Sequence, residues 1–359
     1  MPNLRFPEFE GEWEYVSLQE LAPNISSGKD KPTNGEVTLY GSTGRMGKTD
    51  KVTYNEEIIL VARVGANAGT IQIVNEPCGV TDNALVLNAH TWNHYIYYYL
   101  QQYNLNRLVF GSGQPLITGG MLKKIKIGMG CEAERDKIYK TLMLIDERIS
   151  TQNRIIEDLK SLSNTICERL YSPFEKTDWQ TYKYAELFSI SNERNKALQY
   201  KNVLSASQEY GMVERNELNI DIKFDNSSIK NYKIVRPNEY VIHLRSFQGG
   251  FAYSDKTGVC SPAYTILIPN DKLSEAFLKY YFSSQKFIDS LRIVTYGIRD
   301  GRSINVDEFL QLKIAIPSIS QQKYIVHVMQ QWEQMIRTEE YILDKFQKQK
   351  SYLLKEMFI

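Results

Sequence analysis

The sequence predicts an α+β fold in which two similar mixed α/β domains are joined by two long helices forming an antiparallel coiled coil, with a pseudo-two-fold internal repeat. Three observations lead to this prediction. Two long segments have helical periodicity and contain no Pro or Gly, strand-like runs precede each of them, and residues recur at a slowly growing offset. A long internal period decides the architecture before any single element is assigned.

The first long helix is predicted over residues 135–171. Its apolar side chains recur at gaps of three, four and seven, which places them in one stripe along a helix. The stripe consists of Ile138, Leu142, Ile145, Ile149, Ile156, Leu159, Ile166 and Leu170. At ~1.5 Å per residue such a helix is about 55 Å long, so we expect it to pair with another long helix.

The second long helix is predicted from residue 321 to the end of the sequence. A shift of 187 positions carries seven residues of the stripe onto a second set of hydrophobic residues, namely Ile325, Met329, Trp332, Ile336, Leu343, Phe346 and Met357. For this helix to reach the first, the chain must return across the domain between them. An antiparallel pair is compatible with the lengths of both long helices.

A strand-rich domain is predicted over residues 1–130. The elements expected after an opening segment at 13–21 are strands at 37–40, 58–63, 70–74 and 84–87, a helix at 92–103, a Gly-rich turn at 110–113 and a last element at 121–127. Gly, Asn and Pro between the runs mark the turns.

Residues 172–317 repeat this plan. Trp13, Glu20 and Leu21 match Trp179, Glu186 and Leu187 at an offset of 166. The offset is 182 for Glu57 and Arg63 against Glu239 and Arg245, and 187 for Lys126 against Lys313. We therefore predict domains at 1–130 and 172–317, and helices at 131–171 and 318–359.

Composition excludes some classes of protein without selecting a function. The net charge is +1, residues 1–130 carry 11 basic and 12 acidic side chains, and residues 172–317 carry 19 and 17. A DNA-binding surface would therefore have to come from local clustering. Because no segment approaches the ~18 apolar residues of a membrane span and no signal-peptide run is evident, we expect a cytoplasmic protein.

The four cysteines, Cys78, Cys131, Cys167 and Cys260, are isolated and form no CxxC pair. Such a pattern is typical of reduced thiols in a protein core, and it favours neither disulfides nor a zinc site.

Residues 41–49, GSTGRMGKT, resemble a nucleotide-binding P-loop but do not match its signature. The P-loop signature places a glycine where this chain has Ser42, so we instead expect a Gly-rich loop that presents Arg45 and Lys48 to a polyanion. His90 and His94 lack the Glu of HExxH and are expected on the surface or in packing. We predict no catalytic residue and no metal site. An enzyme whose active-site residues are distant in the sequence and meet only in the folded protein remains an alternative.

Loops rich in Arg, Lys, Asn, Gln and Tyr remain as candidate functional segments. Arg suits a guanine edge and Asn or Gln an adenine edge, because each makes two parallel hydrogen bonds; Lys suits phosphate. The DNA-binding residues predicted in this way are Arg45, Lys48, Arg63, Asn67, Gln114, Arg245, Gln248, Tyr253, Arg299 and Arg302. Each of these residues is equally compatible with a solvated loop position. Arg63 and Arg245 occupy equivalent positions in the two repeats, so a shared scaffold role is an alternative for both.

The ordered landmarks resemble the specificity subunit of type I restriction–modification systems over the whole chain. The landmarks are segments 13–21 and 179–187, 58–69 and its counterparts 240–253 and 258–264, 122–127 and 312–317, and the helix entries at Ala133 and Ser320. The second entry, IPSISQQK at 316–323, is nearer the family pattern than the first, which lacks the proline.

The resemblance implies two target-recognition domains that each read one half of a split DNA site, with the helices setting the unread spacer. It implies a non-catalytic subunit without a cofactor of its own. Its partners would be double-stranded DNA, two modification subunits that methylate adenine with S-adenosylmethionine, and restriction subunits that use ATP and Mg²⁺. A coiled-coil scaffold with protein-binding globular ends is the alternative.

Overall fold

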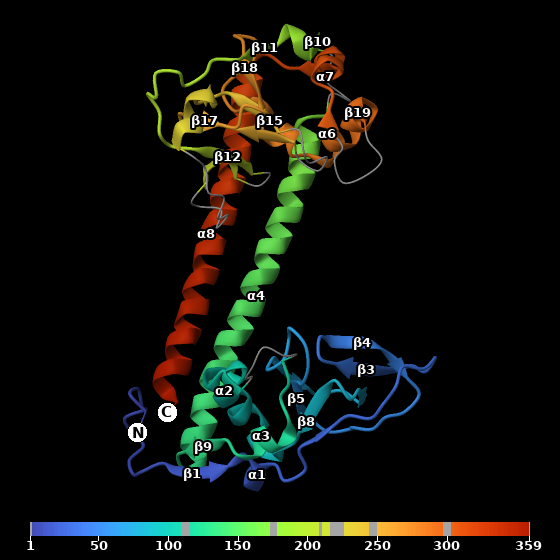
Figure 1. The fold of residues 1–359 in the computed structure, drawn as a ribbon, viewed down its shortest axis with the longest axis vertical. Helices are drawn as coiled ribbons and strands as arrows, with labels where there is room; N and C mark the ends of the chain where they lie inside the picture. The colour runs from blue at the N-terminus through green and yellow to red at the C-terminus, as the bar shows by residue number, and fades with distance from the viewer. Residues whose placement is uncertain are drawn as a thin grey trace. The chain divides into compact units, whose positions relative to one another are not determined.

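The computed structural model describes residues 2–108, 115–172, 178–207, 210–215, 226–243, 250–296 and 303–358 (Figure 1). The chain divides into two compact units, one made of Met1–Arg154 with Glu340–Ile359 and the other of Ile155–Glu339. Each unit holds a globular domain together with a segment of both long helices, α4 (Glu132–Leu170) and α8 (Ile319–Met357).

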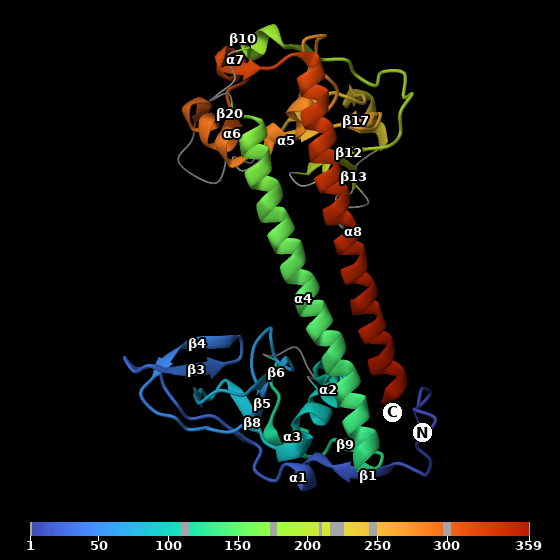
Figure 2. The ribbon, with the colours of Figure 1, turned by 180° about the vertical axis from the view of Figure 1, so that it is seen from behind.

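The two long helices are present as predicted, each with 39 residues. In α4 the predicted stripe is buried at Ile138, Leu142, Ile145 and Ile156 and half-buried at its other positions. Within the first unit the helices run antiparallel: Asp146 of α4 pairs with Lys350 of α8 at 2.6 Å, and two residues further along α4 the guanidinium of Arg148 lies over the ring of Phe346. Both views show the two segments side by side (Figures 1 and 2).

The domain of the first unit is built on a four-stranded antiparallel sheet in the order β2-β8-β5-β6, with a three-stranded sheet β4-β3-β7 and a pair β1-β9. Its elements are β1 (Glu14–Ser17), α1 (Leu18–Leu21), β2 (Ser26–Ser27), β3 (Val37–Gly41), β4 (Gly44–Thr49), β5 (Ile58–Ala62), β6 (Ile71–Val74), β7 (Cys78–Val80), β8 (Ala84–Leu87), α2 (Asn93–Tyr103), α3 (Gly119–Lys123) and β9 (Lys126–Met129).

Strand β5 is buried on both faces, which explains its uninterrupted apolar sequence. Ile59 and Val61 face the main core, where α2 and the start of α4 pack, whereas Ile58 and Leu60 face a smaller core on the other side of the sheet. The end of α8 also enters the main core through Met357 and Phe358. The first domain is therefore completed by the last residues of the chain.

The domain of the second unit has a four-stranded antiparallel sheet in the order β11-β18-β15-β16 and the pairs β10-β21, β12-β13, β14-β17 and β19-β20. Its elements are β10 (Gln180–Lys183), β11 (Phe188–Ser191), β12 (Leu204–Ser207), β13 (Gly211–Glu214), β14 (Lys233–Val235), β15 (Tyr240–Ile242), β16 (Phe251–Tyr253), β17 (Gly258–Cys260), β18 (Thr265–Pro269), α5 (Phe277–Phe282), α6 (Gln285–Ser290), β19 (Thr295–Tyr296), β20 (Ser303–Ile304), α7 (Val306–Gln311) and β21 (Lys313–Ile316).

The core of the second unit is rich in aromatic rings. Phe282 lies 4.7 Å from Phe251 and 4.6 Å from Phe287 between ring centroids, within the range of favourable aromatic pairs. Cys167 of α4 and Met329 of α8 belong to the same cluster. Both long helices therefore contribute side chains to this core, as they do in the first unit.

The predicted internal repeat is confirmed by the strand pairing. Glu14 pairs with Met129 in β1-β9, and Gln180 pairs with Ile316 in β10-β21, which reproduces the offsets of 166 and 187 found in the sequence. The four-stranded sheets also share one order, because β2, β8, β5 and β6 correspond to β11, β18, β15 and β16.

The segment at 41–49 was predicted as a loop, and this prediction is wrong. Residues Gly44–Thr49 form β4, which pairs antiparallel with β3 in a hairpin. A polar strand of this kind gives no period-two apolar signal, and its conformation depends on the partner strand. No helix follows to point its N-terminus at phosphates, which agrees with the rejection of a P-loop.

The cysteines are all free, but only three are core residues. Cys78, Cys167 and Cys260 are buried, and burial raises the pKa of these thiols, to about 11 for Cys78 and to about 12 for the other two. Cys131 is exposed just before α4, so its prediction as a core thiol is wrong.

A tyrosine–carboxylate hydrogen bond joins the domain to a long helix in both units. Tyr98 of α2 donates to Asp146 of α4 at 2.8 Å, and Tyr280 of α5 donates to Glu333 of α8 at 2.7 Å. The two tyrosines differ by the offset of 182 and the two acids by 187, so the bond is part of the repeat.

The N-terminal segment is attached to the first unit by a buried carboxylate. Glu134, whose side chain is fully buried, accepts hydrogen bonds from Arg5 Nε at 2.7 Å, Arg5 Nη2 at 2.8 Å and Trp13 Nε1 at 3.2 Å. The Leu4 N–H donates to the Glu356 carbonyl at 2.9 Å. Glu134 therefore connects the opening segment and the residue just before β1 to α4.

Replacement of Glu134 by Ala is expected to lower the melting temperature by about 5–10 °C, because it removes the carboxylate that pairs with Arg5 and leaves the buried Trp13 indole N–H without its acceptor. Glu134→Gln should lose less, since one acceptor remains. Thermal unfolding followed by circular dichroism measures both, with the exposed neighbour Glu132→Ala as the control. Equal melting temperatures for the three variants would contradict the assignment.

Candidate nucleic-acid interface

The first group of predicted DNA contacts lies on the β3/β4 hairpin. Gly44, the first residue of β4 after the turn, has φ +97°, a conformation that favours glycine. A register shift between Leu39 and Tyr40 adds an irregularity to the hairpin. Arg45 and Lys48 are both exposed on β4, so the structure places two predicted cations on one short strand.

Arg45 is held by a surface network. Its Nη2 lies 2.9 Å from Glu76 Oε1 and its Nε donates to the Tyr40 hydroxyl at 3.2 Å, while that hydroxyl also donates to Glu76. The bond to Tyr40 and the charge of Glu76 raise the pKa of the guanidinium. Because the Arg45 side chain is 69% exposed, the ion pair contributes little stability, and the guanidinium can exchange it for another acceptor.

The second group lies on the loop between β5 and β6. Gly65 and Gly69 adopt positive φ, and Gly65 N–H donates to the Pro115 carbonyl at 3.2 Å. Asn67 is exposed at the tip, whereas Arg63 is half-buried at the base. The Arg63 Nε is buried and has no hydrogen-bond partner among the residues that the structure describes.

Five predicted contacts lie outside the described residues: Gln114, Arg245, Gln248, Arg299 and Arg302. The Gly-rich turn expected at 110–113 lies outside them too.

Tyr253 was predicted on a loop, but it is the last residue of β16. Its half-buried ring packs edge-on against Tyr240 with centroids 5.3 Å apart. Burial raises the pKa of Tyr253 to about 12, and the carboxylates of Glu275 and Asp255 act in the same direction. The ring therefore has anionic side chains nearby.

The two histidines of the HTWNH segment lie where packing and surface residues are expected. His94 stacks on Tyr139 of α4 and lies 3.1 Å from Glu57, whereas the His90 side chain is 77% exposed. Within the described ranges, no group of three or more His, Cys, Asp and Glu side chains could hold a metal ion. In the same ranges, no helix combines the length and the apolarity needed to cross a membrane.

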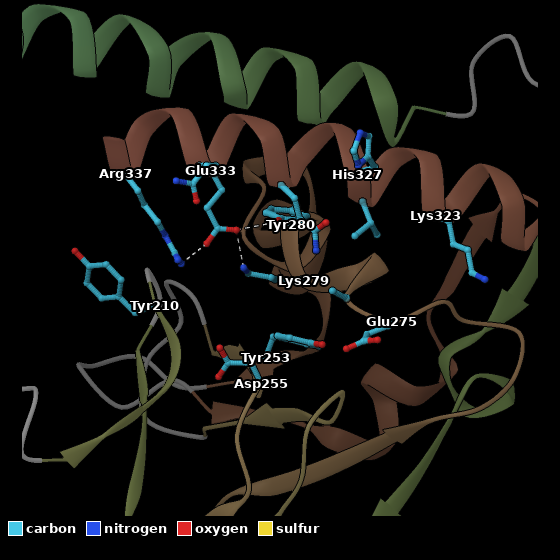
Figure 3. A pocket seen from close by; sticks show the side chains of 14 residues that line it. Tyr210, Tyr253, Asp255, Glu275, Lys279, Tyr280, Lys323, His327, Glu333 and Arg337 are labelled. Atoms are coloured by element: carbon cyan, nitrogen blue, oxygen red, sulfur yellow. Dashed lines mark hydrogen bonds and ion pairs between the residues drawn. The ribbon is translucent and has the colours of Figure 1, made fainter. Parts of the chain in front are cut away.

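Sequence reasoning missed a pocket in the second unit, between β16, α5 and α8 (Figure 3). Its volume is about 540 Å³ and its lining is dominated by tyrosines and charged side chains. The lining residues come from elements that are far apart in the sequence, so no local sequence pattern predicts the pocket.

The comparisons with known proteins agree with this architecture. The family model for the type I restriction modification DNA specificity domain matches residues 10–161 and 176–347. A curated relative, the type I restriction enzyme MjaVIII specificity subunit of Methanocaldococcus jannaschii, is 22% identical over 97% of this chain and 85% of its own length.

Two solved structures share the fold. The S subunit of a type I restriction–modification system from M. genitalium is 15% identical, with a TM-score of 0.62 over 100% of this chain and 99% of that one. A chain from a type I system studied for its complex assembly and conformational transition is 13% identical, with a TM-score of 0.59 over 97% of both chains. Since the family model covers both repeats, the chain belongs to the specificity subunits of type I restriction–modification systems, which are the non-catalytic subunits that recognise DNA.

Proposed function

We propose that this subunit reads a bipartite DNA site, with residues 1–130 and residues 172–317 as target-recognition domains for the two halves. The observation that carries the proposal is the repeated domain plan: the same sheet order and pairing offsets occur in both units, while loop residues differ. Two related but non-identical surfaces suit two unrelated half-sites. The long helices at 131–171 and 318–359 would set the spacer between them.

The proposed DNA contacts are the ten predicted residues. Support differs between them: Arg45, Lys48 and Asn67 are exposed on the hairpin and loop of the first unit, as contacts require. Arg63 has weaker support, because it is half-buried and its Nε is buried, although that Nε has no acceptor in the described part. Tyr253 is the weakest of the set, because phosphate would be repelled by Glu275 and Asp255.

Substitutions on β4 separate base reading from phosphate binding. Lys48→Ala should weaken binding to all DNA sequences and reduce the salt slope by about one, because one phosphate contact is lost. Arg45→Ala should instead lower discrimination at one base position by about 10- to 100-fold, as for loss of a bidentate contact. Fluorescence-anisotropy titrations at several salt concentrations, with single-base variants of the site, measure both effects.

The control for this pair is Lys345→Ala, which removes an exposed lysine from α8. If Lys48→Ala and Arg45→Ala behave like the control in affinity, discrimination and salt slope, the hairpin does not contact DNA.

The subunit would act in a cytoplasmic complex with two modification subunits and with restriction subunits, which would carry S-adenosylmethionine, ATP and Mg²⁺. The similarity in fold to a chain from a type I system studied for complex assembly supports this proposal.

Methylome sequencing of a host that carries this subunit and its modification subunits tests the function. The expected result is adenine methylation at one split site with two defined halves and an unread spacer of fixed length. Methylation without a defined site, or with a single continuous site, overturns the proposal. No methylation together with stable protein complexes would favour a coiled-coil scaffold.

A further inference from the structure

The guanidinium of Arg45 is held along one of its two edges. Its Nε donates to the Tyr40 hydroxyl at 3.2 Å, and its Nη2 lies 2.9 Å from Glu76 Oε1. The Tyr40 hydroxyl also donates to Glu76, so the three side chains form a closed ring of hydrogen bonds. Nε and Nη2 belong to the same edge of the planar guanidinium, and that edge is therefore fixed by the protein itself.

The anchor of this network is a core residue. Tyr40 is 7% exposed, and its ring belongs to the smaller core of the first unit. The hydrogen bond from Tyr40 and the charge of Arg45 outweigh burial and lower the pKa of Glu76. An exposed ion pair of this kind adds little stability, so the main effect of the network is on the orientation of the guanidinium.

The other edge of the Arg45 guanidinium is open. Within the described part of the chain Nη1 makes no hydrogen bond, and the side chain is 69% exposed. Nη1 and Nη2 can therefore present two parallel N–H donors to a ligand. In the major groove guanine offers two acceptors, O6 and N7, whereas adenine offers one acceptor beside a donor. The open edge matches guanine.

The position of Glu76 is occupied by a lysine in the second unit. Ile59 and Tyr240 are equivalent, because both face the main core of their unit. Their partners on the neighbouring strands are Ile73 and Tyr253. Three residues after these partners stand Glu76 and Lys256.

The positions of Tyr40 and Arg45 also differ between the units. Six residues after the same two partners stand Gly79 and Val259, whose parallel neighbours are Leu39 and Val203. The residues that follow these neighbours, Tyr40 and Leu204, belong to matching small clusters on one side of the sheet. Across the hairpins they pair with Arg45 and Glu214. The second unit thus lacks all three members of the network.

This difference separates the network from the shared framework. Framework contacts recur in both units, as the hydrogen bonds Tyr98–Asp146 and Tyr280–Glu333 do. A device that reads bases has to differ between two domains that read different half-sites.

We propose that Tyr40 and Glu76 are positioning residues that orient Arg45 to read a guanine in the half-site of the first domain. This inference rests on the proposed function, in which Arg45 contacts DNA. Tyr40 and Glu76 keep the Nε–Nη2 edge, while Nη1 and Nη2 donate to guanine O6 and N7. Because the network is present in the chain without DNA, binding requires little further ordering of the side chain.

The test measures base discrimination by the complex of this subunit with its modification subunits, at the split site that methylome sequencing defines. Fluorescence anisotropy gives affinities for that site, for its single-base variants and for DNA without the site. Tyr40→Phe and Glu76→Gln should each lower discrimination about three- to tenfold, because each removes or weakens one hydrogen bond to the guanidinium. The loss should fall on the G·C pair at which Arg45→Ala lowers discrimination.

Two further measurements distinguish positioning from a structural role. Affinity for DNA without the site should not fall in either variant, and Glu76→Gln should raise it, because a negative charge is removed. In an Arg45→Ala background neither substitution should lower discrimination further, since the arginine that they position is absent.

The matched controls leave the network intact. Tyr54→Phe removes a hydroxyl from a tyrosine that packs against the same smaller core, and Glu36→Gln removes an exposed carboxylate just before β3. Both should discriminate bases as the wild type does. Thermal unfolding checks that all variants fold.

The outcomes separate this proposal from the proposed function. Discrimination by Tyr40→Phe and Glu76→Gln within twofold of the controls overturns the positioning role, whether or not Arg45→Ala loses discrimination. An equal loss at every base position overturns it too, because that is the effect of a general structural change. A relaxed position other than a G·C pair overturns the assignment of guanine. If the wild-type complex shows no bipartite methylation, the proposed function itself fails.

Discussion

Exchange of residues 172–317 for the corresponding domain of an unrelated specificity subunit is expected to change one half of the methylated site and to leave the other half intact. The physical reason is that each domain has its own sheet and its own hydrophobic core. We therefore expect loops held on separate sheets to read separate half-sites. Methylome sequencing before and after the exchange measures the result.

The foreign domain must reproduce the contacts with the two long helices, because Cys167 of α4 and Met329 of α8 pack into the core of the second unit. A reciprocal exchange of residues 1–130 is the control and should change the other half-site. A change in both halves from either exchange, or in neither, contradicts modular reading.

A matched heptad added to both long helices is expected to abolish methylation at the original spacing. Insertions after Asn153 and after Glu340 preserve the apolar stripe and lie beside the boundary between the two units. At ~1.5 Å per residue, each helix becomes about 10 Å longer, which corresponds to roughly three base pairs at ~3.4 Å per step. DNA also turns by about a third of its ~10-base-pair repeat over that length.

The complex must therefore select a longer spacer at a cost in DNA twist, or bind all sites poorly. Methylome sequencing distinguishes the two results, and both are compatible with helices that set the spacer. A heptad added to only one helix is the control; it breaks the matched seam and should prevent assembly. Undiminished methylation at the original spacing after the double insertion would mean that the helices only dock partner subunits.

Local periodicity was enough to predict the long helices and the repeat. The stripe at Ile138, Leu142 and Ile145 is buried as predicted, because a helical period is a property of adjacent residues and survives any arrangement of the rest. The offsets of 166 and 187 reappear as strand pairs because insertions fall in connections and not in paired strands.

Several features depended on contacts between distant residues and could not be read locally. Strand β4 is polar and is formed by pairing with β3, so Arg45 lies on a strand and not in a loop. Tyr253 ends a buried strand beside two acids, although its neighbours in sequence suggested a DNA-contacting loop. In both cases the partner strand decides the conformation, and no local signal identifies that partner.

The sequence by itself determined a twofold plan of domain and long helix and, through its ordered landmarks, the family. Only the tertiary structure showed that Met357 and Phe358 pack into the core of the first unit and that Glu134 binds Arg5, which is 129 residues away in the sequence. It also placed Asp255 and Glu275 in the lining of one pocket. Periodicity records which face of an element is buried. Hydrogen bonds and pockets depend on which faces meet, and that is decided when non-local elements pack.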